Sequence, residues 1–189
     1  MTEASSGATS VATDAAGPVA ACDGAAECER TVFVTSVRYP ADFGGVAGAE
    51  AHCNDLARTS SHPLVRGRRF AAWVCATTVE SWPSARLVKG TRRYVRPDGQ
   101  RVADDWATLA SPSHRGPIDL DETGTVVATG DVWTGCVEDG TATSASCGGW
   151  TTPRNGLGTI GSATSASASW SNTQDVLCTQ LARLYCIEQ

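Results

Sequence analysis

The spacing of hydrophobic positions changes several times along this chain, and the alternating stretches predict strands. Residues 30–40, RTVFVTSVRYP, are rich in Val, Thr and Phe and end at a proline, which is typical of a buried strand. Residues 68–78, RRFAAWVCATT, predict a second strand, and turn-bounded strands are expected near residues 125–135. Residues 182–188, ARLYCIE, alternate as a final strand. We expect the first and last strands to pair, which brings the two ends of the domain together.

Alternation also assigns side chains to the two faces of these strands, because successive residues of a strand point to opposite sides. In the second strand Trp73 and Cys75 share one face. The opposite face of that strand carries Phe70, Ala72 and Val74. In the final strand the residues that share a face are Ala182, Leu184 and Cys186.

Two stretches have the spacing of a helix. In residues 44–60, GGVAGAEAHCNDLARTS, small apolar residues recur every three or four positions. A shorter helix is expected around residues 103–110, ADDWATLA, whereas residues 149–170 predict a long loop of Gly, Ser and Thr. The inward stripe of the first helix comprises Val46, Ala49, Cys53, Leu56 and Ala57.

This order of elements predicts a single α+β domain with a mixed sheet, two short helices and long loops. With 189 residues, 41% of them hydrophobic and 19% charged, the chain has the composition of a globular protein. Residues 1–29 are mostly small, so we expect a flexible leader followed by the domain at 30–189. No apolar run is long enough to span a membrane, and the sequence carries no recognisable secretory signal.

Eight cysteines with irregular spacing favour a disulfide framework over a metal site. The three histidines stand apart from one another, which also argues against zinc. Because disulfides persist in oxidising compartments, we expect a secreted or surface-displayed protein. The sequence VAAC ending at Cys22 has the shape of a lipoprotein cleavage site, although no apolar stretch precedes it, and Cys22 with Cys28 could close a small local loop.

Charge is distributed unevenly, although the net charge is only −5. Residues 66–101 hold nine basic and two acidic side chains, a local charge of +7. Residues 102–140 hold eight acidic and one basic side chain, a local charge of −7. The negative net charge argues against a general nucleic-acid binder. The most informative candidate for binding is therefore the basic segment, residues 85–101, ARLVKGTRRYVRPDGQR.

Several motifs together resemble a known family. The segments GAEAHCNDLAR, DDWATLA, DVWTGCVEDG, SCGGWTT and LYCIEQ run collinearly with the endostatin domain of collagens and its bacterial relatives on exported surface proteins. A cysteine on the first helix and a final C-x7-C pair are similar to the wider C-type-lectin-like fold. The resemblance covers residues 30–189 and implies an endostatin-like, C-type-lectin-like domain. It implies no single function, because this scaffold hosts many.

The resemblance also implies disulfide pairing. By position, the family's nested bridges correspond to Cys53 with Cys186 and to Cys147 with Cys178. Cys75 and Cys136 fall where endostatin has no cysteines, and because they lie on strands expected to be adjacent we pair them with each other. Cys22 and Cys28 then form the fourth bridge.

Calcium, zinc and catalysis each lack the residues that they require. Residues 149–170 contain no Asp or Glu, so the calcium site of many lectins of this fold is not expected. No histidine falls where endostatin binds zinc, and no catalytic motif is present. Acids in residues 119–122 and at Glu138 and Asp139 could hold a cation, but turn formation is the favoured interpretation. We expect no cofactor and no enzymatic activity.

The basic segment has two interpretations. Its arginines could pair with the acids of the following segment, which is the alternative that we favour. They could instead bind sulfated or otherwise anionic glycans, because guanidinium groups bind such anions in a bidentate manner. Arg92 and Arg93 resemble paired arginines of endostatin. The candidate ligand-binding residues are Arg86, Lys89, Arg92, Arg93, Arg96, Trp82 and Trp170, the two tryptophans being the ones expected to be exposed.

These features together predict an extracellular binding or adhesion module. Its partner would be an anionic glycan, a cell-wall polymer or a surface protein. The alternative is a structural subunit or spacer of an extracellular assembly, in which copies of the protein contact one another.

Overall fold

The structure, a computed structural model, describes residues 29–152 and 156–189. The expected leader therefore lies outside the described residues, apart from Glu29, and so does the expected Cys22–Cys28 loop. The strands are β1 (Glu29–Val34), β2 (Phe70–Ala72), β3 (Arg93–Val95), β4 (Arg101–Ala103), β5 (Asp131–Trp133), β6 (Leu157–Ser162), β7 (Gln174–Leu177) and β8 (Tyr185–Glu188). The helices are α1 (Gly45–Thr59), α2 (Pro83–Arg86), α3 (Trp106–Leu109) and α4 (Cys147–Trp150), with 3₁₀ turns η2 (Val79–Ser81) and η3 (Ala168–Trp170).

The larger sheet has five strands in the order β2-β8-β1-β3-β4. β1 and β8 pair antiparallel, with Val32 opposite Ile187 and Val34 opposite Tyr185. The pairing expected between the first and last strands is therefore confirmed. β1 also pairs with β3 in parallel, which makes the sheet mixed.

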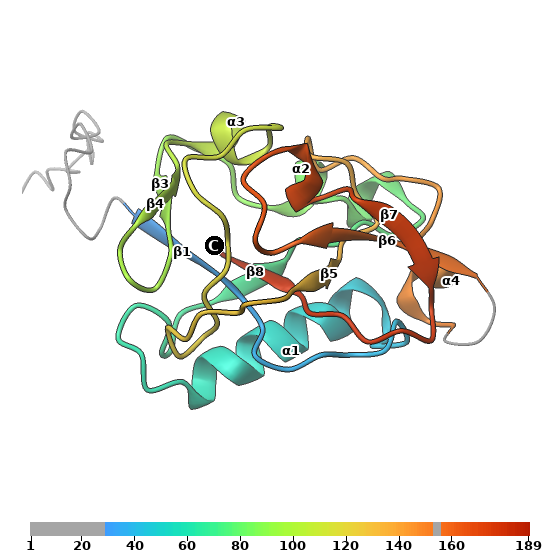
Figure 1. Ribbon diagram of the computed structural model, residues 1–189, viewed down its shortest axis with the longest axis horizontal. Coiled ribbons are helices and arrows are strands. Elements are labelled where there is room, and N and C mark those ends of the chain that lie inside the picture. Colours follow the sequence, from blue (N-terminus) through green and yellow to red (C-terminus); the bar gives the residue numbers. More distant parts are fainter. Residues whose placement is uncertain (1–28, 153–155) are drawn as a thin grey trace, which may run out of the picture.

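A smaller antiparallel sheet has the order β5-β6-β7. It joins the larger sheet through a parallel bridge between Val132 and Arg183, the latter two residues before β8. In Figure 1 the smaller sheet lies beside the larger one, and α1 runs along one side of β8 and β5. The described part of the chain thus forms a mixed α+β fold with two sheets.

The strands carry two apolar clusters, one on each face, as the alternation predicts. Trp73 and Cys75 belong to one cluster, together with Tyr185 from β8. Phe70 and Ala72 belong to the other, where α1 covers the sheet. The second cluster also includes Phe33 and Cys186 from β1 and β8, together with Val74 and Leu184, which lie next to β2 and β8.

Small residues allow α1 to lie close against the sheet. Ala49, Cys53 and Ala57 recur every fourth position, and all three are fully buried. Val46 and Leu56, the other expected members of the stripe, are partly buried. No helix among the described residues is long and apolar enough to cross a membrane.

Three disulfides join distant parts of the chain. Cys53 on α1 is bonded to Cys186 on β8, and Cys147 at the start of α4 is bonded to Cys178. The third bridge joins Cys75 to Cys136. These pairs coincide with three of the four expected from the sequence.

The structure differs from the elements expected from the sequence in three places. Residues 149–170 are not one long loop, because β6 lies within them and pairs on both sides. The pattern predicts no element in the basic segment, yet it includes the end of α2, all of β3 and Arg101, the first residue of β4. Both expected helices are present, as α1 and α3, but α1 has 15 residues, and α2 and α4 are two further helices of four residues each.

Candidate functional site

The structure separates the basic segment into buried and exposed side chains. Arg86 ends α2, and its guanidinium side chain is only 14% exposed. It forms an ion pair with Glu50 of α1, and its Nε donates to the Ser81 carbonyl at 2.9 Å. Its Nη2 donates to the carbonyl oxygens of Ala72 and Val74. Burial lowers the pKa of Arg86, and the charge of Glu50 opposes that shift.

Arg96 is also largely buried and paired with acids, so little of its side chain is accessible to a ligand. Its side chain is 12% exposed and forms ion pairs with Asp98 and Asp119. Burial acts to lower its pKa, but hydrogen bonds to Asp98 and attraction to Asp119 and Asp98 outweigh it, so the pKa is raised. Pairing with an acid of the following segment, as expected, is thus confirmed for Arg96, and Arg101 pairs with Asp104 in the same way.

Lys89, Arg92 and Arg93 remain available. Lys89 and Arg92 are exposed, and Arg93 is partly buried at the start of β3. None of the three forms an ion pair with an acid of residues 29–152 or 156–189. The Lys89 ammonium lies 5.8 Å from the centroid of the Trp106 ring, which is within the range of a cation–π contact.

The two tryptophans expected to be exposed have other positions. Trp170 is fully buried, and its indole nitrogen donates to the Ser111 carbonyl at 3.1 Å. The expectation that it contacts a ligand from the surface is therefore wrong, because η3 turns the ring into the core beside Trp73 and Tyr185. Trp82 is partly buried against the core, and its indole nitrogen donates to the Ala76 carbonyl at 3.2 Å.

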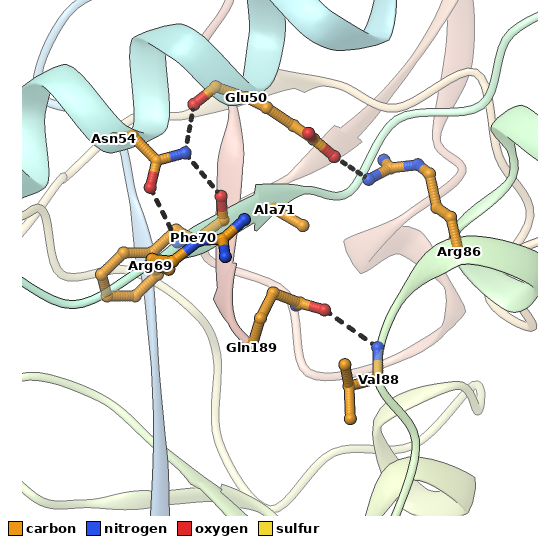
Figure 2. A pocket seen from close by; sticks show the side chains of 8 residues that line it. All are labelled: Glu50, Asn54, Arg69, Phe70, Ala71, Arg86, Val88 and Gln189. Atoms are coloured by element: carbon orange, nitrogen blue, oxygen red, sulfur yellow. Dashed lines mark hydrogen bonds and ion pairs between the residues drawn. The ribbon is translucent and has the colours of Figure 1, made fainter.

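A pocket of about 460 Å³ lies at the outer edge of β2. Figure 2 shows Glu50 and Asn54 entering it from α1 and Arg86 from the side of α2. Arg69, immediately before β2, and Gln189, immediately after β8, also line it. Its volume is in the range that holds a small ligand.

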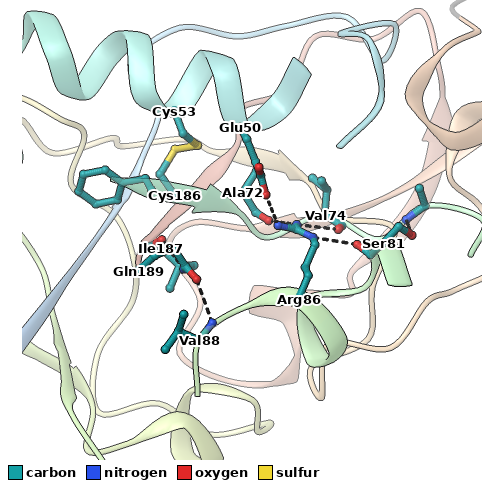
Figure 3. A network of polar contacts seen from close by, with 12 residues as sticks. Glu50, Cys53, Ala72, Val74, Ser81, Arg86, Val88, Cys186, Ile187 and Gln189 are labelled. Atoms are coloured by element: carbon teal, nitrogen blue, oxygen red, sulfur yellow. Dashed lines mark hydrogen bonds and ion pairs between the residues drawn. A yellow bond between two sulfur atoms is a disulfide. The ribbon is translucent and has the colours of Figure 1, made fainter. Parts of the chain in front are cut away.

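Side chains of α1 and α2 form hydrogen bonds with the backbone N–H and C=O groups along the outer edge of β2. The Asn54 amide accepts from the Phe70 N–H at 3.0 Å and donates to the Phe70 carbonyl at 2.8 Å. Arg86 provides donors to Ala72 and Val74 farther along the same edge. Figure 2 shows the bonds of Asn54, and Figure 3 shows those of Arg86 near the Cys53–Cys186 bridge, which fixes α1 to β8. The floor of the pocket is therefore held by hydrogen bonds and a disulfide.

The sequence did not single out Glu50, Asn54 or Gln189 as binding residues. Glu50 and Asn54 are four positions apart on α1, so the helical period places them on one face. Arg69 was recognised only as part of the charge of residues 66–101. Their proximity to Arg86 depends on the packing of α1 and α2 against β2, which no local pattern specifies.

The acids that could hold a cation have protein donors instead. Asp121 accepts through Oδ1 from the backbone N–H groups of Thr123 and Thr125, at 2.9 and 3.0 Å. Asp139 accepts from the Thr141 N–H at 2.8 Å. These contacts are typical of turns. Within the described residues, His, Cys, Asp and Glu side chains do not gather in groups of three or more that could hold a metal ion.

The histidines are placed in structural contacts. His52 stacks on Tyr39 with ring centroids 4.0 Å apart, and burial lowers its pKa. His114 is buried, and its Nε2 lies 2.8 Å from the Leu109 carbonyl. Burial lowers the pKa of His114, and the bond to Leu109 opposes that shift.

Comparison with known proteins adds no family assignment. The chain matches no protein-family model and no curated protein. The interpretation of the pocket and of the exposed cations therefore depends on their geometry and charge.

Proposed function

We propose that this protein is an extracellular or surface-displayed binding module with an endostatin-like, C-type-lectin-like fold, and that its ligand is an anionic glycan or cell-wall polymer. The fold assignment is supported by the Cys53–Cys186 and Cys147–Cys178 bridges and by a final strand inserted beside the first. The same bridges are compatible with an oxidising, extracellular environment.

The observation that carries the functional proposal is the unpaired positive charge of Lys89, Arg92 and Arg93. Arg86 is ion-paired with Glu50, and Arg96 is ion-paired with Asp98 and Asp119. Lys89, Arg92 and Arg93, in contrast, have no acidic partner among the described residues. They lie within five consecutive positions, in the connection after α2 and at the first residue of β3. A repeating polyanion can contact several such cations at once, with an attraction that weakens as salt screens it.

Retention on a heparin column tests this proposal. We expect the Arg92→Ala, Arg93→Ala double variant to elute at lower salt and to bind about tenfold more weakly, because two charge-assisted contacts are lost. The matched control is Arg38→Ala with Arg66→Ala, which removes the same charge from two exposed arginines outside the segment that form no ion pair among the described residues. Equal retention of the parent and the Arg92, Arg93 variant would contradict the proposal. An equal loss of retention in the control would show that the net charge of the protein, rather than the position of Arg92 and Arg93, determines heparin binding.

A structural role in an assembly is the second candidate, supported by exposed leucines. Leu157 and Leu177 face each other across β6 and β7 and are 48% and 59% exposed, and Leu181 is 56% exposed. Exposed apolar side chains on a surface favour contact with another copy. Sedimentation at increasing concentration tests this role. A mass that stays monomeric throughout would exclude it.

A further inference from the structure

The pocket beside β2 contains one cation whose donors are unused. Arg69 is exposed and lines the pocket, and its side chain has no hydrogen bond or ion pair with the rest of the described chain. Neighbouring Arg68 differs, because it pairs with Glu188 at 2.9 Å. In Figure 2 the Arg69 guanidinium lies in the middle of the view, between Asn54 and Gln189. Its planar guanidinium can therefore donate two N–H groups to an anion that enters the pocket.

The other polar groups of the pocket are mostly occupied. Asn54 is held by Phe70 and by the Glu50 carbonyl, and the side chain of Gln189 bridges Val88 and Ile187. Glu50 accepts from Arg86 through Oε1, and its Oε2 has no partner among the described residues. Arg86 Nη1 makes that one contact, which leaves its second N–H for another acceptor. The lining of the pocket thus contains an unused acceptor on Glu50 and an unused donor on Arg86, in addition to the free guanidinium of Arg69.

We propose that this pocket binds an acidic sugar unit, with the single negative charge of a carboxylate or sulfate ester on Arg69 and the sugar hydroxyls on Glu50 Oε2 and Arg86 Nη1. The inference rests on the proposed function, because it identifies the part of an anionic glycan that the pocket accepts. Hydroxyl groups both donate and accept, which matches an acceptor beside a donor. The side chain of Val88, 50% exposed at the rim, supplies apolar contact for the sugar ring.

Glu50 also sets the charge that the pocket accepts. Arg86 neutralises Glu50, so one unpaired guanidinium remains to balance one negative charge. A phosphate monoester carries close to two negative charges at pH 7, and the lone Arg69 guanidinium would balance only one of them. The site therefore favours an acid with one negative charge over a phosphate.

Titration of the ¹⁵N-labelled protein by NMR tests the inference with four probes: glucuronate, glucose 6-sulfate, glucose 6-phosphate and glucose. We expect glucuronate or glucose 6-sulfate to bind with a dissociation constant on the order of 1 mM, a value suited to one sugar unit. Binding of glucose should be about tenfold weaker or more, and glucose 6-phosphate should also bind more weakly. Whichever acidic probe binds more tightly identifies the preferred acid.

Variants at two neighbouring arginines provide the control. Arg69→Ala should weaken binding of the acidic probe about tenfold or more, and Arg69→Lys should weaken it less, because an ammonium keeps the charge but not the fork. Arg66→Ala removes the same charge from an exposed arginine that does not line the pocket, and binding should be unchanged. Equal binding of the parent and Arg69→Ala, or an equal loss in Arg66→Ala, would overturn the inference.

The result is separable from that of the heparin experiment. If the polymer is retained through Arg92 and Arg93 and no acidic probe binds, the pocket inference fails and the proposed function stands. If glucuronate binds through Arg69 and the polymer is not retained, the polymer proposal fails and a site for small acidic sugars remains.

Discussion

At the level of single residues, burial divides one run of arginines into two groups. Arg86 and Arg96 have side chains that are 14% and 12% exposed, and each is surrounded by acceptors. Arg92 is exposed and has no acidic partner among the described residues. The same residue type therefore stabilises the fold at two positions and remains free for a ligand at another.

Arg86→Ala tests the structural role of the first group. We expect the free energy of unfolding to fall by about 3 kcal/mol, because the substitution leaves the Ala72 and Val74 carbonyls and the Glu50 carboxylate without their shared donor. Urea denaturation measures the change. Arg101→Ala is the control, since its ion pair with Asp104 is more than a third exposed on both sides and should contribute less than about 1 kcal/mol. Similar losses in both variants would contradict this account.

At the level of elements, β6 forms where composition predicts a loop. Its glycines are required by close neighbours, because a Cβ on Gly161 would lie 1.9 Å from the Trp170 carbonyl oxygen. A Cβ on Gly158 would lie 2.7 Å from the Cys147 sulfur. Glycine in the interior of a strand is typical of such close approach. The weak strand propensity of LGTIGS is thus offset by pairing with β5 and β7.

Gly161→Ala should therefore destabilise the protein by about 2 to 3 kcal/mol, because the added methyl group must displace the backbone at Trp170. Ser162→Ala, in the same strand but partly exposed, should change stability by no more than about 0.5 kcal/mol. Thermal or urea unfolding of both variants checks the difference. If Gly161→Ala is as stable as the control, β6 does not pack against η3 in solution as described.

Backbone groups at several strand edges are hydrogen-bonded to segments outside the sheets. Asn54 and Arg86 bond the outer edge of β2, the Arg115 N–H donates to Val102 of β4, and Arg183 bonds β5. Covered edges resist pairing with other chains. The side chains that line the pocket thus also protect the sheet.

At the level of the whole molecule, disulfides connect elements that lie far apart in the sequence. The Cys53–Cys186 bridge spans 133 residues and fastens α1 to β8, whereas Cys147–Cys178 spans 31 residues. All four cysteines are buried. In the chain-entropy account, the bridge that closes the longer loop removes more freedom from the unfolded chain.

Replacing both cysteines of one bridge in each variant tests whether the longer loop contributes more stability. Cys53→Ala with Cys186→Ala should cost about 5 kcal/mol of unfolding free energy, and Cys147→Ala with Cys178→Ala about 4 kcal/mol. Cys75→Ala with Cys136→Ala, which opens a span of 61 residues, should fall between them and serves as the internal comparison. Urea denaturation at equal pH and salt gives the three values. A reversed order would mean that lost packing, rather than loop length, dominates.

The sequence by itself determined the features that depend on local spacing. Alternation placed Trp73 and Cys75 opposite Phe70 on the two faces of a strand, and the helical period placed Cys53 on the buried side of α1. These features follow from the geometry of a strand and a helix, which repeats every two and 3.6 residues. The resemblance of its motifs, rather than spacing, implied the nested disulfides.

Only the tertiary structure decided which polar residues meet. Glu50, Arg69 and Arg86 come from α1, the residue before β2 and the end of α2, and no local pattern brings them into one pocket. The buried position of Trp170 and the strand at residues 157–162 depend in the same way on neighbours distant in sequence. Burial and pairing across the fold outweigh local propensity at these positions, because each is fixed by contacts that form only when the chain is folded.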